Sequence, residues 1–386
     1  MSWRYQKAES GAPRVLLVTQ RGLQPAASRG LRFEFEDQVQ ELDVADLAGP
    51  DGPVIASPLM RRAARAADRA VPGLTSLLAR DRPPLAARYE LVFVALEALS
   101  DLLVLQPIDW LLRLAPASIC FVDEVWRKGL RDRGGELRLL RPFDRVLLGT
   151  AGSVEELQEL SGRPCGYLPP SVDAAALCPY PLAPARAIDV YSMGRRSPQT
   201  HGALLELAER RLWFYLYDTL AANRVQNHRE HRRQLGNLLR RTRYFLAYPG
   251  KADAAVETGG QSEIGFRYFE GAAAGALLVG EPPANPWFER LFGWPDAIVP
   301  LAWGSTAVEE ALAPLEADPA RVERARRANV AGALLHHDHV YRWAEILSAV
   351  GLPETAAMER RRRELRRLAA LACSGDGMPG PGARPS

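Results

Sequence analysis

The sequence predicts an α/β protein made of two doubly wound domains that face each other across a cleft. Three observations lead to this fold class. Short apolar runs alternate with helix-length segments, one stretch rich in proline and alanine interrupts the alternation, and 386 residues exceed what one ordinary core accommodates. Because strands that alternate with helices form a parallel sheet covered on both faces, two such sheets direct their strand ends and helix N-termini toward the cleft.

The N-terminal domain is expected over residues 1–172. Its strands are predicted from apolar, β-branched runs such as RVLLVT, which a polar loop closes. Helix-length segments such as SVEELQELSG separate these runs. The strands are expected at residues 14–19, 89–96, 117–122, 145–150 and 165–170.

The C-terminal domain is expected over residues 188–335, after a linker at 173–187 that has no strand or helix pattern. A late helix at 336–352 should pack back toward the N-terminal domain, and a basic helix with a disordered tail should occupy 353–386. The other expected elements are strands at 188–194, 213–218, 244–250, 276–280 and 297–301, and helices at 201–211, 229–241, 305–315 and 319–332.

Charge and cysteine usage exclude several classes of protein. A formal net charge of +3 gives no strong attraction to nucleic acid, so no nucleic-acid partner is expected. The four cysteines are far apart and form no C-x-x-C pair, which argues against a zinc site or a disulfide framework. No run approaches the roughly 20 apolar residues of a membrane span, and no leader pattern is visible. We therefore expect a cytoplasmic protein.

The segment RYFEGAAAGALLVGEPP, residues 267–283, places a glutamate, Glu270, among small and apolar residues. The helix should begin near Gly265 or Phe266 and end at Gly275, which suits a left-handed terminal residue. Its first turns would lie at the cleft, where a carboxylate can accept hydrogen bonds from two adjacent hydroxyls. Alternatively, Glu270 simply favours the positive end of its helix.

This segment resembles the C-terminal signature of nucleotide-sugar-dependent glycosyltransferases of the GT-B fold (glycosyl transferases group 1), especially the bacterial spore-maturation-type branch. IDVYSMGRRSPQTHGALLEL resembles the start of the donor domain in that family, and FDRVLLGTAGSVEELQELSGRPCGYLPPSVD resembles the end of the acceptor domain. HDHVYRWAEIL resembles the late helix, so the resemblance covers about residues 143–347. It implies two Rossmann-like domains and transfer of a sugar from a nucleotide diphosphate sugar, UDP-sugar as the first choice, without a cofactor. The acceptor stays open among a glycan, a lipid-linked glycan, a protein and a small molecule.

The resemblance also assigns roles to two acidic positions. Glu270 corresponds to the second acid of an E-x7-E pattern, which binds the ribose of the donor. The first acid falls on Ser262 by count, and Glu263 is one residue closer. Glu263 is therefore expected near the hydroxyls of the donor sugar, with Ser262 as the alternative occupant of that position.

Cationic residues near the cleft are expected to bind the diphosphate. Arg195 and Arg196 follow a strand in the loop GRRSPQTH, and Lys251 follows another strand in YPGKADA. Arg267 shares a helix face with Glu270, so it either orients that carboxylate, contacts phosphate or forms an ordinary ion pair. The donor-binding residues expected from the sequence are Glu270, Arg195, Arg196, Lys251, Arg267, Gly265 and Phe266.

No histidine precedes His201, which favours a retaining reaction in which the departing diphosphate takes the acceptor proton. Asp123 or Glu124, at the end of SICFVDEVW, is a candidate base, although an acidic pair at a helix N-terminus would explain both. His336 and His339 would share a helix face without a third ligand, and no Asp-x-Asp triplet occurs, so no metal site is expected.

Two alternatives to a transferase stay open. A sugar-nucleotide epimerase of the same architecture would need acidic or histidine groups on both cleft walls, and a non-catalytic binding or scaffold protein would explain the displaced first glutamate. The basic helix at 358–372 has a thin apolar edge of Leu365, Leu368 and Leu371. That edge suits either weak contact with anionic lipid at the inner membrane face or an ordinary terminal helix.

Overall fold

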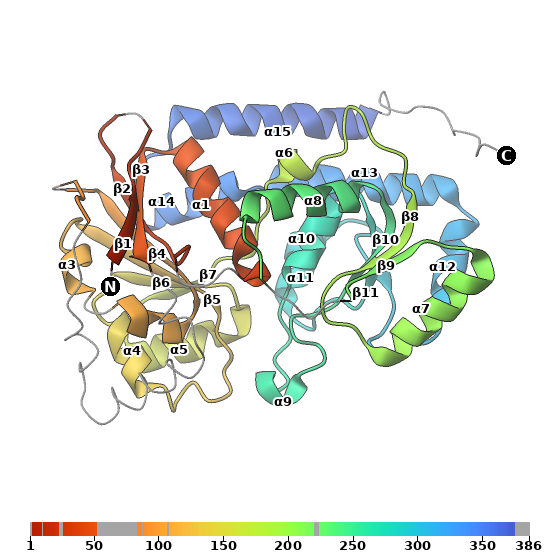
Figure 1. The fold of residues 1–386 in the computed structure, drawn as a ribbon, viewed down its shortest axis with the longest axis horizontal. Helices are drawn as coiled ribbons and strands as arrows, with labels where there is room; N and C mark the ends of the chain where they lie inside the picture. Colours follow the sequence, from red (N-terminus) through yellow and green to blue (C-terminus); the bar gives the residue numbers. More distant parts are fainter. Residues whose placement is uncertain are drawn as a thin grey trace.

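The computed structural model describes residues 2–9, 11–22, 26–51, 83–86, 88–105, 108–219 and 224–374. Over these ranges the chain forms two sheets side by side, each with helices packed on it, which confirms the predicted α/β, doubly wound fold class (Figure 1). We call each sheet with its helices the N-terminal and the C-terminal domain. The tail expected to be disordered, residues 375–386, lies outside the described residues.

The N-terminal sheet has the strand order β1-β3-β2-β4-β5-β6-β7. Only β1 is antiparallel, and it pairs Trp3 with Pro50 of β3. Neither β1 nor β3 was predicted, because β1 is largely polar and β3 contains Gly49 and Pro50. The strands are β1 (Ser2–Gln6), β2 (Val15–Val18), β3 (Ala45–Asp51), β4 (Leu91–Ala98), β5 (Ala117–Glu124), β6 (Arg145–Leu148) and β7 (Cys165–Tyr167).

Helices cover both faces of this sheet. The helix α1 follows β2, so its N-terminus lies at the carboxyl ends of the parallel strands. The others are short and pack on the apolar cluster that contains Leu16, Val92 and Val146. The helices are α1 (Gly30–Leu42), α3 (Asp109–Leu112), α4 (Gly134–Leu140) and α5 (Val154–Ser161), with 3-10 turns η1 (Ala27–Arg29), η4 (Leu99–Leu105) and η5 (Ala151–Ser153).

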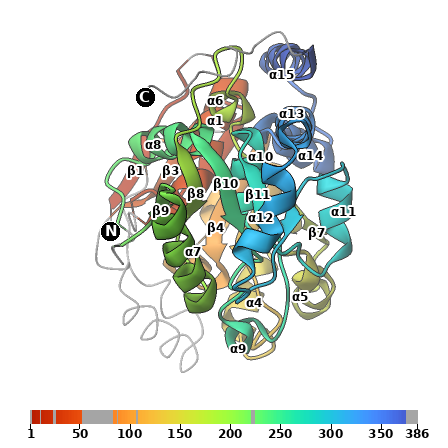
Figure 2. The ribbon, with the colours of Figure 1, turned by 90° about the vertical axis from the view of Figure 1, so that its right-hand side faces the viewer.

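The C-terminal sheet is parallel throughout and has the order β12-β11-β10-β8-β9. The helices α8 and α10 cover one face with the C-terminal half of α13, and α7 and α12 cover the other with the first turns of α13 (Figure 2). The elements are β8 (Ile188–Ser192), α7 (Pro198–Arg211), β9 (Tyr215–Tyr217), α8 (His228–Arg240), β10 (Thr242–Ala247), α9 (Ala255–Thr258), α10 (Phe266–Ala273), β11 (Leu277–Gly280), α11 (Pro286–Phe292), β12 (Val299–Pro300), α12 (Val308–Glu316) and α13 (Pro319–His336).

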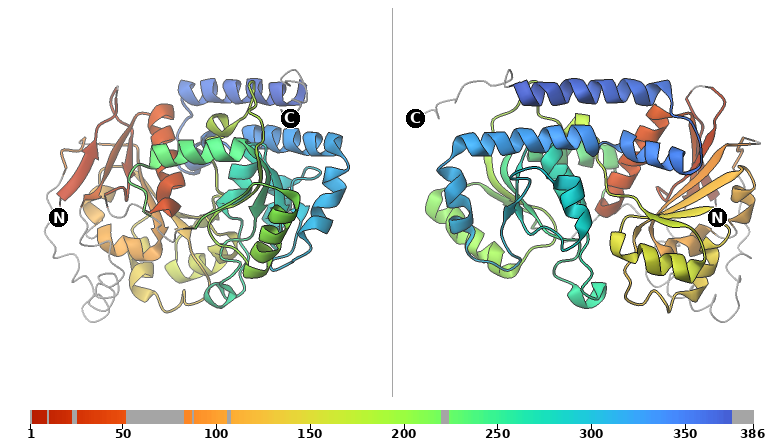
Figure 3. Two further views of the ribbon diagram at one scale, coloured as in Figure 1. Left: turned by 45° about the vertical axis from the view of Figure 1, so that its right-hand side comes forward. Right: turned by 180° about the vertical axis from the view of Figure 1, so that it is seen from behind.

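The two domains share one continuous apolar core. The stretch at 173–187 contains a short helix, α6 (Ala174–Leu177), where no helix pattern was expected. The helix α14 (His339–Ala349) packs against α1, where the buried Trp343 donates to Asp43 at 3.0 Å. The last helix, α15 (Ala356–Ser374), lies along α13 and reaches α1 (Figure 3). Together these helices join both domains on one side.

The apolar edge of α15 is used inside the molecule. Leu365 and Leu368 are buried, and α13 is the main neighbour of this helix. Leu365 and Leu368 therefore pack inside the protein and are not exposed for contact with lipid. Among the helices of the described residues, none is long and apolar enough to cross a membrane.

Candidate functional site

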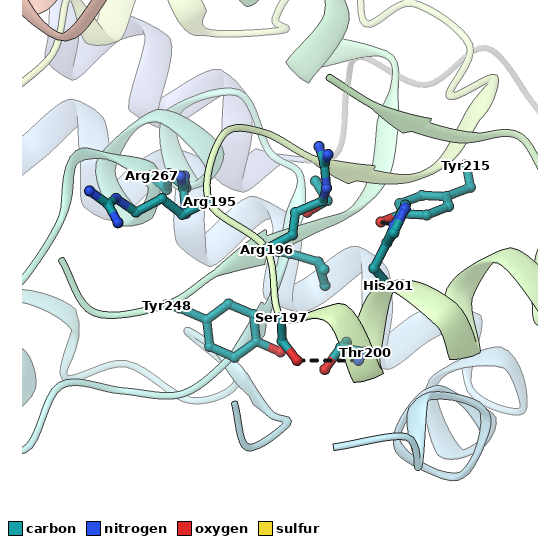
Figure 4. Close-up of a pocket in the computed structure, with 10 residues that line it drawn as sticks. Arg195, Arg196, Ser197, Thr200, His201, Tyr215, Tyr248 and Arg267 are labelled. Atoms are coloured by element: carbon teal, nitrogen blue, oxygen red, sulfur yellow. Dashed lines mark hydrogen bonds between the residues drawn. The ribbon is translucent and has the colours of Figure 1, made fainter. Parts of the chain in front are cut away.

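A pocket of about 260 Å³ lies where β8 ends and α7 begins (Figure 4). Ser197 is the N-cap of α7 and accepts a hydrogen bond from the Thr200 amide at 3.3 Å, and Pro198 occupies the first helical position. The positive end of the helix dipole therefore faces this space. The pocket is lined by Ser192, Arg195, Arg196, Ser197, Thr200, His201, Tyr215, Leu246, Tyr248 and Arg267.

Three of the predicted arginines line this first pocket. Arg195 is 48% exposed and pairs with Asp253, with Nη1 at 2.9 Å from both carboxylate oxygens. Arg196 lies over the Tyr217 ring at 5.3 Å, and its Nη1 is buried without a hydrogen-bond partner. Arg267 reaches in from α10. Three arginines that line one pocket suit an anion with several charged oxygens.

Gly194 makes room for Arg267. Its φ is +71°, and a Cβ built on it would lie 2.7 Å from Nη2 of Arg267. The glycine of the loop GRR is therefore needed both for its backbone conformation and for the close approach of that guanidinium. The amide of Gly194 donates to Asp218 at 2.6 Å, which fixes the loop to the end of β9.

Glu270 lies in the middle of α10, which begins at Phe266 with Gly265 as its N-cap, as predicted. The residue is 3% exposed. Its Oε1 accepts a hydrogen bond from Nη1 of Arg232 on α8, and its Oε2 is buried without a partner. Within the described residues, Glu270 thus forms its ion pair with Arg232, a residue not singled out from the sequence, and not with Arg267.

The same arginine reaches into the N-terminal domain. Nε and Nη2 of Arg232 donate to Glu34 on α1 at 3.0 and 3.1 Å, and Nε2 of His339 lies 3.3 Å from the same carboxylate. Burial alone would raise the pKa of Glu34, but Arg232 and His339 outweigh it and hold this pKa at about 2. The environment of Glu270 therefore depends on residues of both domains.

Glu263 is engaged by the N-terminal domain. Its oxygens accept hydrogen bonds from the amides of Ala151 and Gly152 at 2.9 and 2.8 Å, and Gln261 donates at 2.6 Å. Burial raises the pKa of Glu263, and these three donors only partly offset that effect. The hydroxyl of Ser262 accepts from the Ala284 amide at 3.2 Å. In this conformation the carboxylate of Glu263 joins the domains rather than lining the first pocket.

A second pocket, with an empty volume of about 450 Å³, lies between α1, the end of β5 and α14. Asp123 lines it, and burial raises the pKa of this carboxyl to about 7 although Arg32 opposes the shift. No helix begins there, because β5 ends at Glu124 and α4 starts at Gly134, so the interpretation as a helix N-terminal pair is wrong. The lining residues are Leu31, Arg32, Phe35, Phe121, Asp123, Gly149, Leu168, Pro169, Pro170, Ser171, Phe266, His339 and Arg342.

Glu124 and Lys251 line neither of the two pockets. Nζ of Lys251 is 3.0 Å from Glu124 and lies over the Trp126 ring at 5.2 Å, so this pair connects the two domains. Lys251 therefore does not join the three arginines.

The histidines near residue 337 belong to two helices. His336 ends α13 and His339 begins α14, so they do not share a helix face as expected. Asp338 caps α14 and interrupts the helix. Within the ranges that the structure covers, no group of three metal-binding side chains occurs.

Three buried arginines near these pockets were not predicted from the sequence: Arg32, Arg232 and Arg342. A signal was present in α8, where Arg232 shares a helix face with the buried Leu235 and Leu239. A charged residue on an apolar face needs a partner inside the protein, which marks it for attention. The partners of Arg232, Glu34 and Glu270, are far from it in the sequence and could not be identified from α8 alone.

A family model described as "Glycosyl transferase-like" matches residues 194–348. No curated protein matches the sequence. Anabaena Alr3699/HepE, solved with UDP and glucose, is similar in fold, with a TM-score of 0.50, 12% identity, and coverage of 88% of this chain and 100% of that one. An alpha-glucosyltransferase solved with UDP and a mismatch-containing 13-mer DNA has a TM-score of 0.51, 12% identity, and the same coverage of 88% and 100%.

At such low identity these structures establish the fold. The chain therefore has the GT-B fold of two Rossmann-like domains that was expected from the sequence resemblance. The sequence similarity to glycosyl transferases covers residues 194–348. The narrower placement in a spore-maturation branch stays a prediction.

Proposed function

We propose that this protein is a glycosyltransferase that binds a nucleotide diphosphate sugar in the first pocket and transfers the sugar to an acceptor hydroxyl. One observation carries the proposal: the family match begins at Gly194, directly before Arg195 and Arg196, which line the pocket at the N-terminus of α7. A departing diphosphate gains negative charge, and guanidinium groups beside helix amides stabilise that charge.

A UDP-hexose is the donor we propose first, because the two solved structures of similar fold contain UDP. The buried Oε2 of Glu270 lacks a partner and could accept a hydrogen bond from a ribose hydroxyl. Since Glu270 is 3% exposed, ribose binding would require a shift of the neighbouring α8. Gly265 and Phe266 would keep the N-terminus of α10 beside the donor.

We further propose that transfer retains the anomeric configuration and needs no metal ion. The three arginines of the first pocket supply the positive charge that a leaving diphosphate requires. In a retaining reaction the diphosphate itself can take the proton of the acceptor. The anomeric configuration of the product, and the rate measured with EDTA and with added Mg²⁺, would test these two points directly.

A non-catalytic binding protein is the second candidate, favoured by one observation. Both oxygens of Glu263 are hydrogen-bonded to the N-terminal domain, so no carboxylate at that position is offered to a sugar in this conformation. An epimerase is less well supported, because no carboxylate occurs among the described residues that line the first pocket.

The test is a panel of UDP-, GDP- and dTDP-sugars incubated with the full chain, with thermal stability and release of nucleoside diphosphate as readouts. UDP should stabilise the protein, and one UDP-sugar should be hydrolysed slowly without an acceptor. Arg196→Gln should lose both effects, whereas Arg210→Gln, near the other end of α7, should lose neither. Stabilisation without turnover for any sugar would favour the binding protein, and no effect of any nucleotide would refute donor binding.

A further inference from the structure

We propose that the second pocket binds an acceptor that carries a carboxylate or phosphate group on an apolar body. The anion would be held by Arg32 and Arg342, and the acceptor hydroxyl would lie near Asp123. Binding of the anion is independent of the proposed transferase activity, but the role of the bound molecule as sugar acceptor rests on it.

Arg32 is the main observation. The residue is 6% exposed, it lines the pocket, and Nε, Nη1 and Nη2 all lack a hydrogen-bond partner in the described structure. A buried guanidinium without a partner is costly, because its lost hydration is not replaced. The fold does supply partners to Arg29, one turn earlier, through Glu97 at 2.8 Å and Asp101 at 3.7 Å. Arg32 therefore has no carboxylate partner of the kind that stabilises Arg29.

Arg342 offers a second free donor to the same pocket. This side chain is 4% exposed, and it is fixed by hydrogen bonds from Nε to the Pro169 carbonyl at 3.0 Å and from Nη1 to Glu345 at 2.7 Å. Its Nη2 is buried and has no partner. Two guanidinium groups with unsatisfied N–H groups thus line one space, and paired guanidinium groups are suited to bind carboxylate or phosphate.

The other polar groups of the pocket do not neutralise these arginines. Asp123 is the sole carboxylate among the described lining residues, and no hydrogen bond joins it to Arg32. His339 and Ser171 bond to each other at 2.8 Å, and His339 also faces Glu34. The positive charge at Arg32 therefore remains available to a ligand.

The remaining lining defines the rest of the ligand. Its apolar residues surround an empty space of about 450 Å³, part of which is open to solvent. Small-molecule sites are typically lined in this way, by apolar side chains with a few polar groups. The ligand should therefore combine one anionic group with an aromatic or aliphatic body. The apolar lining residues are Leu31, Phe35, Phe121, Leu168, Pro170 and Phe266.

The position of α10 connects this pocket to the donor pocket. Phe266 lines the second pocket and Arg267, the next residue, lines the first. A sugar released from a diphosphate at Arg267 would therefore lie within a short distance of a hydroxyl beside Phe266. This adjacency favours an acceptor in the second pocket over an unrelated ligand.

Isothermal titration with phenyl phosphate, benzoate and the neutral benzyl alcohol tests the proposal on the full chain. Wild type should bind at least one of the anions and should bind benzyl alcohol more weakly, and the better anion distinguishes phosphate from carboxylate. Arg32→Met should weaken anion binding by about tenfold or more, which corresponds to loss of a charged hydrogen bond. Arg131→Met, an exposed arginine of the same domain, should change nothing.

Two further measurements keep the outcome clear. Arg32→Met should melt no lower than wild type without ligand, because it removes a buried charge that has no partner, and Arg32→Lys should retain part of the anion affinity. Equal binding of anions and benzyl alcohol would overturn the proposal. So would an Arg32→Met variant that loses UDP affinity as strongly as anion affinity, because the pocket would then hold the donor. If the anion binds in a manner that depends on Arg32 but no nucleotide binds, the result would support the anion site and refute the transferase activity.

Discussion

Arg232 on α8 donates two hydrogen bonds to Glu34 on α1, at 3.0 and 3.1 Å, while its remaining terminal nitrogen donates to Glu270. One guanidinium therefore holds a carboxylate from each domain. Because the side chain of Arg232 is only 8% exposed, each of these charges depends on the others for its stability. The orientation of Glu270 is consequently linked to the contact between the domains.

Glu34→Gln should destabilise the protein by about 2 kcal/mol, because it leaves Arg232 with one carboxylate in a nearly dry setting. Urea unfolding followed by circular dichroism measures the change. Glu309→Gln, which disrupts an exposed pair with Arg211, serves as the control and should leave the unfolding midpoint unchanged.

Glu34→Gln should also change how the free energy of unfolding decreases at acidic pH. The pKa of Glu34 is lowered from 4.5 to about 2, so the ionised group stabilises the folded state above about pH 4.5, and this contribution is lost as the pH falls toward 2. Glu34→Gln should therefore have a shallower decline across that window. An identical decline in both proteins would show that Glu34 does not carry this effect.

Local patterns were sufficient to predict much of the fold. The start of α10 at Phe266 and the left-handed Gly275 follow from the spacing of small and apolar residues. The strand β3 was missed because Gly49 and Pro50 disfavour a strand by propensity. A Cβ at Gly49 would lie 2.1 Å from the Thr19 carbonyl, so close packing between neighbouring segments requires the glycine. Tertiary contacts thus override the local signal there.

In the candidate site, too, features within one segment could be predicted from the sequence, whereas contacts between distant segments could not. Arg195, Arg196 and Arg267 were expected near one ligand and do line one pocket, because two of them share a loop and the third lies in the first turn of α10. The pairing of Glu263 with amides at Ala151 could not be read from either segment, since it depends on how the domains meet. The lack of any partner for Arg32 is likewise a property of the assembled fold.

Glu270→Gln should weaken UDP binding by about tenfold, because the amide replaces one acceptor oxygen by a donor and removes the charge that strengthens a hydrogen bond to a hydroxyl. Calorimetric titration with UDP gives the affinity directly. Glu289→Gln, on the exposed surface of α11, is the matched control. Unchanged UDP affinity in Glu270→Gln would mean that the ribose does not reach this carboxylate.

The ionisation of Asp123 should make kcat/KM of sugar transfer increase with pH. Burial holds its pKa at about 7 instead of 3.8, against the attraction of Arg32 and with the help of Glu124 and Glu97. The ionised form would orient the acceptor hydroxyl by accepting its hydrogen bond before the proton passes to the departing diphosphate, so kcat/KM should increase with pH and level off above about 7. Asp123→Asn should lower kcat/KM by about tenfold, which corresponds to loss of a charged hydrogen bond, and should lack this rise, whereas Glu124→Gln should keep it.

The stability of the folded state gives an independent measure of the same group. Between pH 3.8 and about 7 the folded protein holds a proton that the unfolded chain has released, so the free energy of unfolding falls as the pH rises through this window. Asp123→Asn removes that decline and should be at least as stable as wild type at pH 8. A wild-type protein with no decline would show that Asp123 has an ordinary pKa.

Gly194→Ala and Gly202→Ala should have opposite effects although the two glycines are eight residues apart. At Gly194 an alanine must adopt a φ of +71° with its Cβ 2.7 Å from Arg267, so it should cost about 1 kcal/mol and displace that guanidinium from the first pocket. Gly202 lies within α7 with open space around it, so alanine there should add about 0.5 to 1 kcal/mol of stability. UDP titration should show weaker binding for Gly194→Ala alone. Equal UDP affinity in both variants would indicate that Arg267 does not contact the nucleotide, because the one change that moves it would have left binding intact.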